Sequence, residues 1–173
     1  SVFSTYGVFT SMMTNCVRLT LIGNHLNPKK KGFFIMQAAH DGPETGEDGP
    51  THQGLYWMSM FNAYPGIKVY KPLDANETIE MLFYAIEKGE PIALSVSRPN
   101  TPVFDRSNGV PPAREAVNGA YIFKNYSGGG GEKLVLAVSG SIMMKNTLEV
   151  VPDLESSGYD VKVLAVTSPE LFE

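Results

Sequence analysis

Short apolar runs alternate with helical patterns along the first hundred residues, and this order constrains the fold more than any other feature of the sequence. The runs at 33–36, 67–70 and 92–96 have the length and composition of strands. The segments 55–64 and 74–86 carry apolar residues at helical spacing. Because strands that are separated by helices pair in parallel, the sequence predicts an α/β fold with a parallel sheet flanked by helices.

The start of the helix at 74–86 has its own signal. Asp74 and Glu77 are spaced as an acidic variant of the capping box, in which the two side chains satisfy free backbone N–H groups. Apolar residues then follow at helical spacing, so the sequence predicts a helix that begins close to Asp74.

The segment 9–21 is apolar around most of a helix surface, and a helix of this kind is expected to be buried on several sides. Cys16 lies on this segment and is expected to be an inert core thiol. As the only cysteine it excludes an internal disulfide framework and a cysteine-based zinc site. This cysteine usage is typical of a reducing compartment and predicts a cytoplasmic location.

Residues 99–113 contain four prolines and an Asn-Gly pair, a composition typical of a linker or a crossing segment. After it, the segments 134–138, 143–154 and 161–166 have the patterns of a strand, a helix and a strand. The sequence therefore predicts that a second α/β unit begins behind the linker.

The charge balance argues against two classes of partner. Fourteen Lys and Arg against eighteen Asp and Glu give a net charge of −4, without the basic stripe that binding to a phosphate backbone requires. No apolar run reaches the roughly 18 residues of a membrane span. We therefore expect neither a nucleic acid nor a membrane as a partner.

A polar loop at 41–53 directly follows the first predicted strand, and the loop with its flanking His40 holds two of the three histidines. Ligands of open α/β sheets gather beyond the carboxyl ends of strands, so His40, Asp48 and His52 are candidates for acid, base or hydroxyl-binding roles. A solvated turn has a similar composition and is the alternative. A metal site with His40, Asp48 and His52 as ligands is a further alternative, although their spacing is not compact.

Other candidates lie outside this loop. Tyr6 and Phe9 offer either a flat surface for a cofactor ring or part of the core. Arg98, at the end of a predicted strand, either binds an anionic substrate or forms a surface ion pair. The glycines at 128–131 superficially resemble a phosphate loop, but they precede a predicted strand, which favours a flexible surface loop.

The stretch 46–53, Gly-Glu-Asp-Gly-Pro-Thr-His-Gln, with His40 and Asp41 ahead of it, resembles the central domain of transketolase, a thiamine diphosphate enzyme. The resemblance covers nearly the whole chain and implies that it is a fragment of a longer protein. It implies the later part of the pyrimidine-binding domain at 1–105, a linker at 106–118 and the start of the C-terminal domain at 119–173. The resemblance continues through residues 72–77, 93–98, 119–121 and 168–172.

The resemblance also implies a role for each candidate residue. Tyr6 and Phe9 match the aromatic pocket around the aminopyrimidine ring of the cofactor. His40 and His52 match histidines near the C1 hydroxyl of the donor and its reacting carbonyl. Asp48 matches a carboxylate that accepts a substrate hydroxyl, and Arg98 matches the guanidinium that binds the terminal phosphate of the substrate.

The implied activity is transfer of a two-carbon ketol unit from a ketose phosphate to an aldose phosphate, with thiamine diphosphate and Mg²⁺ as cofactors. The resemblance places the catalytic Glu before Ser1 and the diphosphate and Mg²⁺ site in another domain, so the chain alone is expected to be inactive. The complete protein is expected to be a homodimer. A deoxyxylulose-phosphate synthase, a 2-oxoacid dehydrogenase subunit and a non-catalytic dimerisation fragment are the alternatives.

Overall fold

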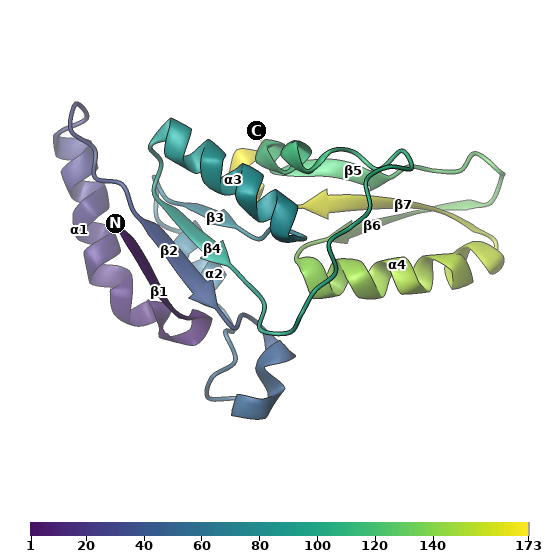
Figure 1. Cartoon of the computed structure of the whole chain (residues 1–173), viewed down its shortest axis with the longest axis horizontal. Coiled ribbons are helices and arrows are strands. Elements are labelled where there is room, and N and C mark those ends of the chain that lie inside the picture. The colour runs from purple at the N-terminus through teal and green to yellow at the C-terminus, as the bar shows by residue number, and fades with distance from the viewer. Residues whose placement is uncertain (173) are drawn as a thin grey trace. The chain divides into compact units, whose positions relative to one another are not determined.

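The structure is a computed structural model that describes residues 1–172, apart from the side chains of residues 44–46. Glu173, the last residue of the expected second domain, lies outside the described residues. The chain divides into two compact units (Figure 1). Unit 1 consists of Ser1–Tyr70 and Leu82–Asn100, and unit 2 consists of Lys71–Met81 and the chain from Thr101 onward.

Four parallel strands form the sheet of unit 1, in the spatial order β1, β2, β4, β3. This confirms the predicted parallel sheet. β2 extends through the polar Gln37, beyond the apolar run that marked it, because backbone pairing with β1 and β4 continues there. β1 is not among the predicted strands, since its residues are exposed or half-buried and its apolar residues neither alternate nor form one continuous run. The strands are β1 (Val2–Tyr6), β2 (Ile35–Ala39), β3 (Lys68–Tyr70) and β4 (Ile92–Ser95).

The core of unit 1 lies between this sheet and the helices α1 (Thr14–Leu26) and α2 (Trp57–Asn62). Val17 of α1 and Trp57 and Phe61 of α2 are almost fully buried. Side chains from the strands and the segments around them complete the cluster. These are Phe34, Met36, Ala38, Ile67, Val69 and Ala93.

Helix α1 differs from its prediction at both ends. Residues Gly7–Met13 form the 3₁₀ helix η1, and the α-helix begins only at Thr14 and continues to Leu26. Val17 is the buried residue of α1, whereas Leu19 and Cys16 are exposed. The predicted burial on several sides and the predicted core thiol are therefore wrong, because a helix on a sheet buries one face and no described element covers the opposite face.

Helix α3 (Ala75–Lys88) begins where the capping signal places it. Asp74 Oδ1 accepts a hydrogen bond of 2.9 Å from the backbone N–H of Glu77. The side chain of Glu77 reaches one residue further than in the standard box, because its Oε2 accepts from the N–H of Leu73 at 2.8 Å. Both side chains are buried, so this helix start is fixed inside unit 2.

Unit 2 contains a three-stranded sheet in the order β5, β7, β6, with helix α4 (Ser141–Ser156) between β6 and β7 in the chain. β6 and β7 are parallel, as a strand, helix and strand predict, and β5 is antiparallel to β7. Met144 and Val151 of α4 are buried, as are alternate residues of β7. The strands are β5 (Ala120–Lys124), β6 (Glu132–Val138) and β7 (Tyr159–Val166).

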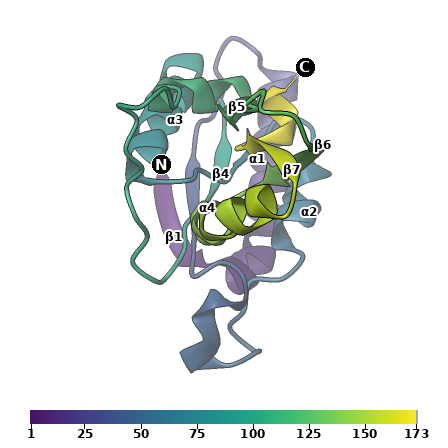
Figure 2. The same cartoon turned by 90° about the vertical axis from the view of Figure 1, so that its right-hand side faces the viewer.

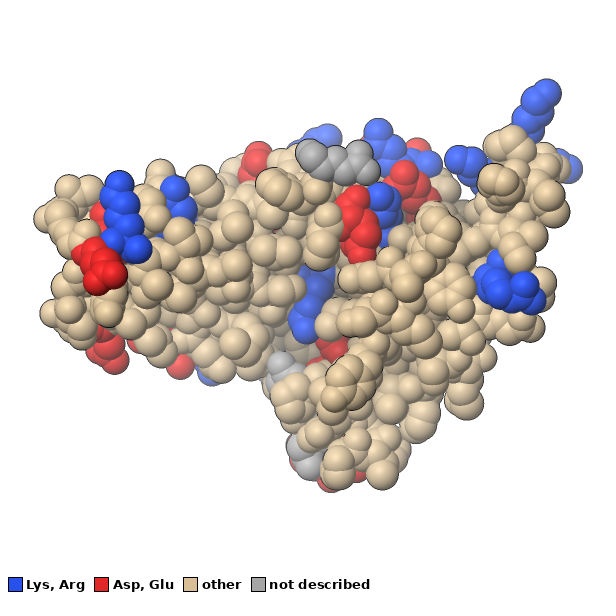
Figure 3. Space-filling model, turned by 180° about the vertical axis from the view of Figure 1, so that it is seen from behind, with Lys and Arg blue, Asp and Glu red and all other residues tan. Residues whose placement is uncertain are grey.

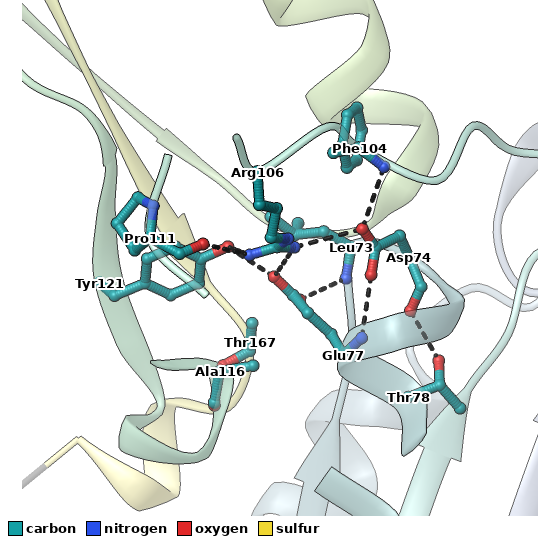
Figure 4. A network of polar contacts seen from close by, with 10 residues as sticks. All are labelled: Leu73, Asp74, Glu77, Thr78, Phe104, Arg106, Pro111, Ala116, Tyr121 and Thr167. Carbon is teal, nitrogen blue, oxygen red and sulfur yellow. Dashed lines mark hydrogen bonds and ion pairs between the residues drawn. The ribbon is translucent and has the colours of Figure 1, made fainter. Parts of the chain in front are cut away.

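A buried polar network holds the linker segment inside unit 2 (Figure 4). Arg106 donates to Asp74 Oδ2 at 3.2 Å and to Glu77 Oε1 at 2.8 Å, and it also bonds to the hydroxyl of Tyr121. Burial disfavours the charged guanidinium, but the hydrogen bonds to Glu77 and Tyr121 outweigh it, so the pKa of Arg106 is raised. Burial and the nearby Glu77 charge raise the pKa of Tyr121 as well.

The glycine segment at 128–131 connects β5 to β6, and its start is held by a carboxylate of its own chain. Asp160 accepts hydrogen bonds from the N–H and hydroxyl of Ser127, at 2.8 and 3.0 Å, and from the N–H of Gly128. The backbone hydrogen bond from Ser127 is the largest cause of a lowered pKa of Asp160. N–H groups at the start of the segment thus bind a carboxylate.

The remaining regular segments are short 3₁₀ helices: η2 (Pro43–Asp48), η3 (Ala113–Asn118) and η4 (Pro169–Leu171). Within the part of the chain that the structure describes, no helix has the length and apolar character that crossing a membrane requires.

Candidate functional site at the carboxyl ends of the unit 1 strands

The candidate residues lie where the strands of unit 1 end. Tyr6 is the last residue of β1, His40 follows the last residue of β2, and Arg98 stands three residues after β4. The carboxyl ends of parallel strands meet at one edge of the sheet, where ligands of α/β sheets bind. Both cartoon views show η2 projecting from this edge (Figures 1 and 2).

Two aromatic rings and two imidazoles form one cluster at this edge. The rings of Tyr6 and Phe9 are stacked, with centroids 6.0 Å apart. His40 lies edge-on to Tyr6 at 4.1 Å, and His52 lies edge-on to both rings, at 5.7 Å from Tyr6 and 5.5 Å from Phe9. The fold thus brings together four of the six residues that the sequence singles out, from β1, η1 and both ends of the polar loop.

The backbone and the side chain of His40 are both unusual. Its φ is +54°, in the left-handed region that residues other than glycine adopt only at a cost. Its Nδ1 is buried and has no hydrogen-bond partner in the part of the chain that the structure describes. A buried imidazole nitrogen without a partner costs free energy, which a bound group with a suitable donor or acceptor would recover. The Nδ1 of His52, by contrast, lies 3.0 Å from the hydroxyl of Thr51.

The other two candidate residues form an ion pair with each other. The Arg98 guanidinium donates to the carboxylate of Asp48 through one nitrogen. Through another it donates to Oε2 of Glu47 at 3.1 Å. Asp48 and Arg98 are partly buried, whereas the Glu47 side chain is 82% exposed. In this structure the Asp48 carboxylate, expected to bind a substrate hydroxyl, and the Arg98 guanidinium, expected to bind a phosphate, are therefore paired with each other.

Comparison with known proteins agrees with the fold and with the motif. Residues 2–103 match the family model for the transketolase pyrimidine-binding domain, which is more than half of the chain. The chain belongs to the transketolase family. It is 31% identical over 170 residues to transketolase 10 of Craterostigma plantagineum and 32% identical over 171 residues to the transketolase of Buchnera aphidicola.

These matches cover 98% of this chain but 23% and 24% of the two transketolases, so the chain spans about a quarter of their length. A crystal structure of Pichia stipitis transketolase in complex with sedoheptulose 7-phosphate superposes with a TM-score of 0.80 at 27% identity. That match covers 99% of this chain and 23% of the yeast chain. The family relationship therefore applies to both units described above.

Metal-binding groups and surface charge are two further features of this transketolase-family chain. No group of three or more His, Cys, Asp or Glu side chains among the described residues is arranged to hold a metal ion. On the face in Figure 3, Lys and Arg occur in small groups, several of them next to Asp or Glu, on a largely uncharged surface.

The structure also identifies residues next to the cluster that the sequence pattern did not single out as site residues. Asp41 is buried, and its carboxylate accepts hydrogen bonds from Trp57 at 2.7 Å and from Ser95 at 2.6 Å. Asp41 stands within the polar loop, but its partners are 16 and 54 residues away in the sequence. Contacts between residues so far apart leave no pattern in the local sequence. Only the position of Asp41 directly after His40 indicated that it lies near the site.

Proposed function

We propose that this chain provides part of the site in which a transketolase transfers a two-carbon ketol unit from a ketose phosphate to an aldose phosphate. The observation that carries the proposal is the cluster of Tyr6, Phe9, His40 and His52 at the carboxyl edge of the sheet. A stacked aromatic pair beside two imidazoles suits a planar heteroaromatic cofactor together with groups that exchange protons.

The residues present fit the pyrimidine end of thiamine diphosphate. Tyr6 and Phe9 supply a flat aromatic wall, and the buried Nδ1 of His40 is a hydrogen-bonding atom that has no partner among the described residues. When bound, this cofactor supplies a thiazolium carbon that reacts with the carbonyl of the donor sugar. We assign the diphosphate and Mg²⁺ to residues other than those described here, because no metal-binding group occurs among the latter.

The two imidazoles and Asp48 are proposed to act on the substrate. A neutral imidazole has one donor and one acceptor nitrogen, so His40 and His52 can hold and exchange protons with the donor hydroxyl and carbonyl. The Asp48 carboxylate is proposed to accept a hydrogen bond from a substrate hydroxyl. Because Asp48 binds Arg98 in this structure, the proposal requires this ion pair to rearrange when a substrate enters.

Arg98 is proposed to bind the terminal phosphate of the substrate. Two nitrogens of its guanidinium each bind a different carboxylate, and a single phosphate can accept from both nitrogens with more charge. The Pichia stipitis relative was crystallised with a sugar phosphate, which supports this substrate class. A phosphate would displace Glu47 first, because that side chain is the most exposed of the three.

The assembly and location of the protein are part of the same proposal. We propose the domain boundaries 1–105, 106–118 and 119–173, a homodimer of the complete enzyme and a cytoplasmic location. Exposed apolar side chains along η1 and α1 support the dimer, since a monomer would leave them in water. They are Met12, Leu19, Ile22 and Leu26, all more than 40% exposed. A monodisperse, active monomer in light scattering would contradict the dimer.

The test is kinetic and uses the enzyme in which this chain acts, with its cofactors bound. Arg98→Ala should raise KM for phosphorylated substrates and change kcat much less, because a phosphate contact stabilises ground and transition states alike. The loss should be about 2–3 kcal/mol, typical of a charged contact. His52→Ala should instead lower kcat for phosphorylated and unphosphorylated acceptors. Equal losses with both acceptor types in Arg98→Ala would show that Arg98 is structural.

A second measurement concerns the chain by itself. We expect no tight binding of thiamine diphosphate with Mg²⁺, since the described residues include no metal-binding group. Isothermal titration of the isolated chain measures this directly, and micromolar affinity would contradict the assignment of the diphosphate to other residues.

A further inference from the structure

The carboxylate of Asp41 links three separate segments of unit 1. It follows His40 in the chain, accepts 2.7 Å from Nε1 of Trp57 on Oδ1, and accepts 2.6 Å from the hydroxyl of Ser95 on Oδ2. Its own backbone N–H donates to the carbonyl of Val96. The Asp41 side chain, two residues after the end of β2, therefore holds the first residue of α2 and the last residue of β4.

The indole of Trp57 extends this contact to two more segments. A Cβ atom at Gly7 would lie 2.8 Å from Nε1 of Trp57, and a Cβ at Gly54 would lie 3.2 Å from the same ring. Gly54 also forms backbone bridges with Asp41 and Gly42. Gly7 follows Tyr6 and Gly54 stands two residues after His52, so the Asp41–Trp57 pair contacts the backbone beside each of these site residues.

We propose that Asp41 is the positioning residue of the candidate site and that it acts, through Trp57 and Ser95, on the placement of His40 and His52 against Tyr6. This inference rests on the proposed function. Asp41 needs no contact with cofactor or substrate for this role. It fixes the backbone of the neighbouring His40, whose φ of +54° persists only where the surroundings determine it strongly.

The burial of Asp41, Trp57 and Ser95 indicates that their hydrogen bonds fix one geometry of the site. Asp41, Trp57 and Ser95 are 4%, 3% and 4% exposed, so water cannot replace a lost hydrogen bond at little cost. A displacement of reacting groups by about 1 Å can lower a rate about a hundredfold. A change at Asp41 should therefore move the imidazoles and lower kcat even where the fold survives.

The first experiment uses the full chain and NMR signals of the histidine and tyrosine rings. Wild-type protein should give a nuclear Overhauser contact between Tyr6 and His40, whose centroids are 4.1 Å apart, and imidazole shifts displaced by the neighbouring rings. Asp41→Asn and Trp57→Phe should weaken that contact and move both histidine signals. Ser59→Ala, on the exposed part of α2, is the matched control for Ser95→Ala and should leave them in place.

Two further variants keep the proposal testable if Asp41→Asn does not fold. Ser95→Ala removes one hydrogen bond with little change of volume, and Gly7→Ala adds a methyl group against the indole. Gly23→Ala, in α1 with open space around it, is the control for Gly7→Ala. Unmoved histidine signals in folded Ser95→Ala and Gly7→Ala proteins would overturn the proposal.

The readout in the active enzyme separates this inference from the proposed function. Asp41→Asn should lower kcat by about tenfold or more while KM for phosphorylated substrates changes little, the opposite of Arg98→Ala. If the histidine signals move in Asp41→Asn but the wild-type assembly has no transketolase activity, only the proposed function is contradicted. If kcat falls in Asp41→Asn while the histidine signals stay in place, only the positioning role is contradicted.

Discussion

Arg106 donates a hydrogen bond of 2.8 Å to Glu77, a carboxylate that is fully buried in the first turn of α3. The same guanidinium nitrogen lies 3.2 Å from Asp74, whose side chain is also fully buried (Figure 4). One cation thus compensates two buried carboxylates that cap the helix, and the segment that carries Arg106 is attached to the start of α3.

Removal of this cation should strongly destabilise unit 2. Arg106→Ala leaves two buried carboxylates without their cation, so we expect a loss of about 3–5 kcal/mol in the free energy of unfolding. Arg106→Lys keeps the charge but loses the forked geometry and should recover only part of it. Urea unfolding measures both, with the exposed Arg114→Ala as control. An Arg106→Ala midpoint equal to that of the control would contradict the compensation.

Asp160 predicts a pH dependence of stability. Its pKa is lowered from the ordinary 3.8 by the hydrogen bonds of Ser127 and Gly128, so the ionised form favours the folded state. The stabilisation is present above the unfolded pKa and is lost as pH falls through the lower folded pKa. Wild type should therefore exceed Asp160→Asn in thermal midpoint at neutral pH, and the difference should shrink as the pH falls below the ordinary pKa of 3.8. A pH-independent difference would rule out ionisation as its source.

The ion pair of Glu47 with Arg98 should compete with phosphate. Glu47→Gln removes one of two negative partners of the guanidinium, so inorganic phosphate should bind Arg98 more tightly. An exposed ion pair is worth about 0.2–1 kcal/mol, which corresponds to a gain of up to about fivefold. The side-chain N–H signals of Arg98 report this titration. Glu87→Gln, on the exposed surface of α3, serves as control, and equal affinity of both variants would exclude the competition.

Cys16 should be reactive in the folded chain, because it is exposed on α1. A thiol reagent should modify it at a rate close to that of the urea-unfolded chain. Protection by an order of magnitude in the monomeric chain would show that the thiol is covered. In the proposed homodimer the rate should fall at concentrations where light scattering detects the dimer.

The sequence predicted single helices and strands where the signal came from residues close together in the chain. Asp74 and Glu77 predicted the start of α3, because a cap is a contact between residues three apart. The apolar runs predicted β2, β3 and β4, since buried parallel strands require such residues. β1 and β5 were not predicted. β1 is exposed or half-buried and gains its order from pairing with β2, whereas the apolar run Ala-Tyr-Ile-Phe of β5 is a comparable signal that was missed.

Helix α1 shows why the surroundings of an element cannot be obtained from its own pattern. Its apolar circumference predicted burial on several sides, yet Cys16 and Leu19 are exposed. Periodicity reports which residues a helix would bury if neighbours were present; it contains no information about which neighbours the rest of the chain supplies.

For the site, the sequence by itself determined which reactive side chains are present and that several of them lie at the carboxyl edge of the sheet. The order of strands and helices placed His40 and Arg98 at carboxyl ends, because parallel strands all end on the same side. The strand that ends at Tyr6 was not predicted. Only the tertiary structure decided the pairings: His40 and His52 against Tyr6, Arg98 with Asp48, and Asp41 with Trp57 and Ser95. These contacts join residues far apart in the chain, and their geometry depends on the packing of every element between them.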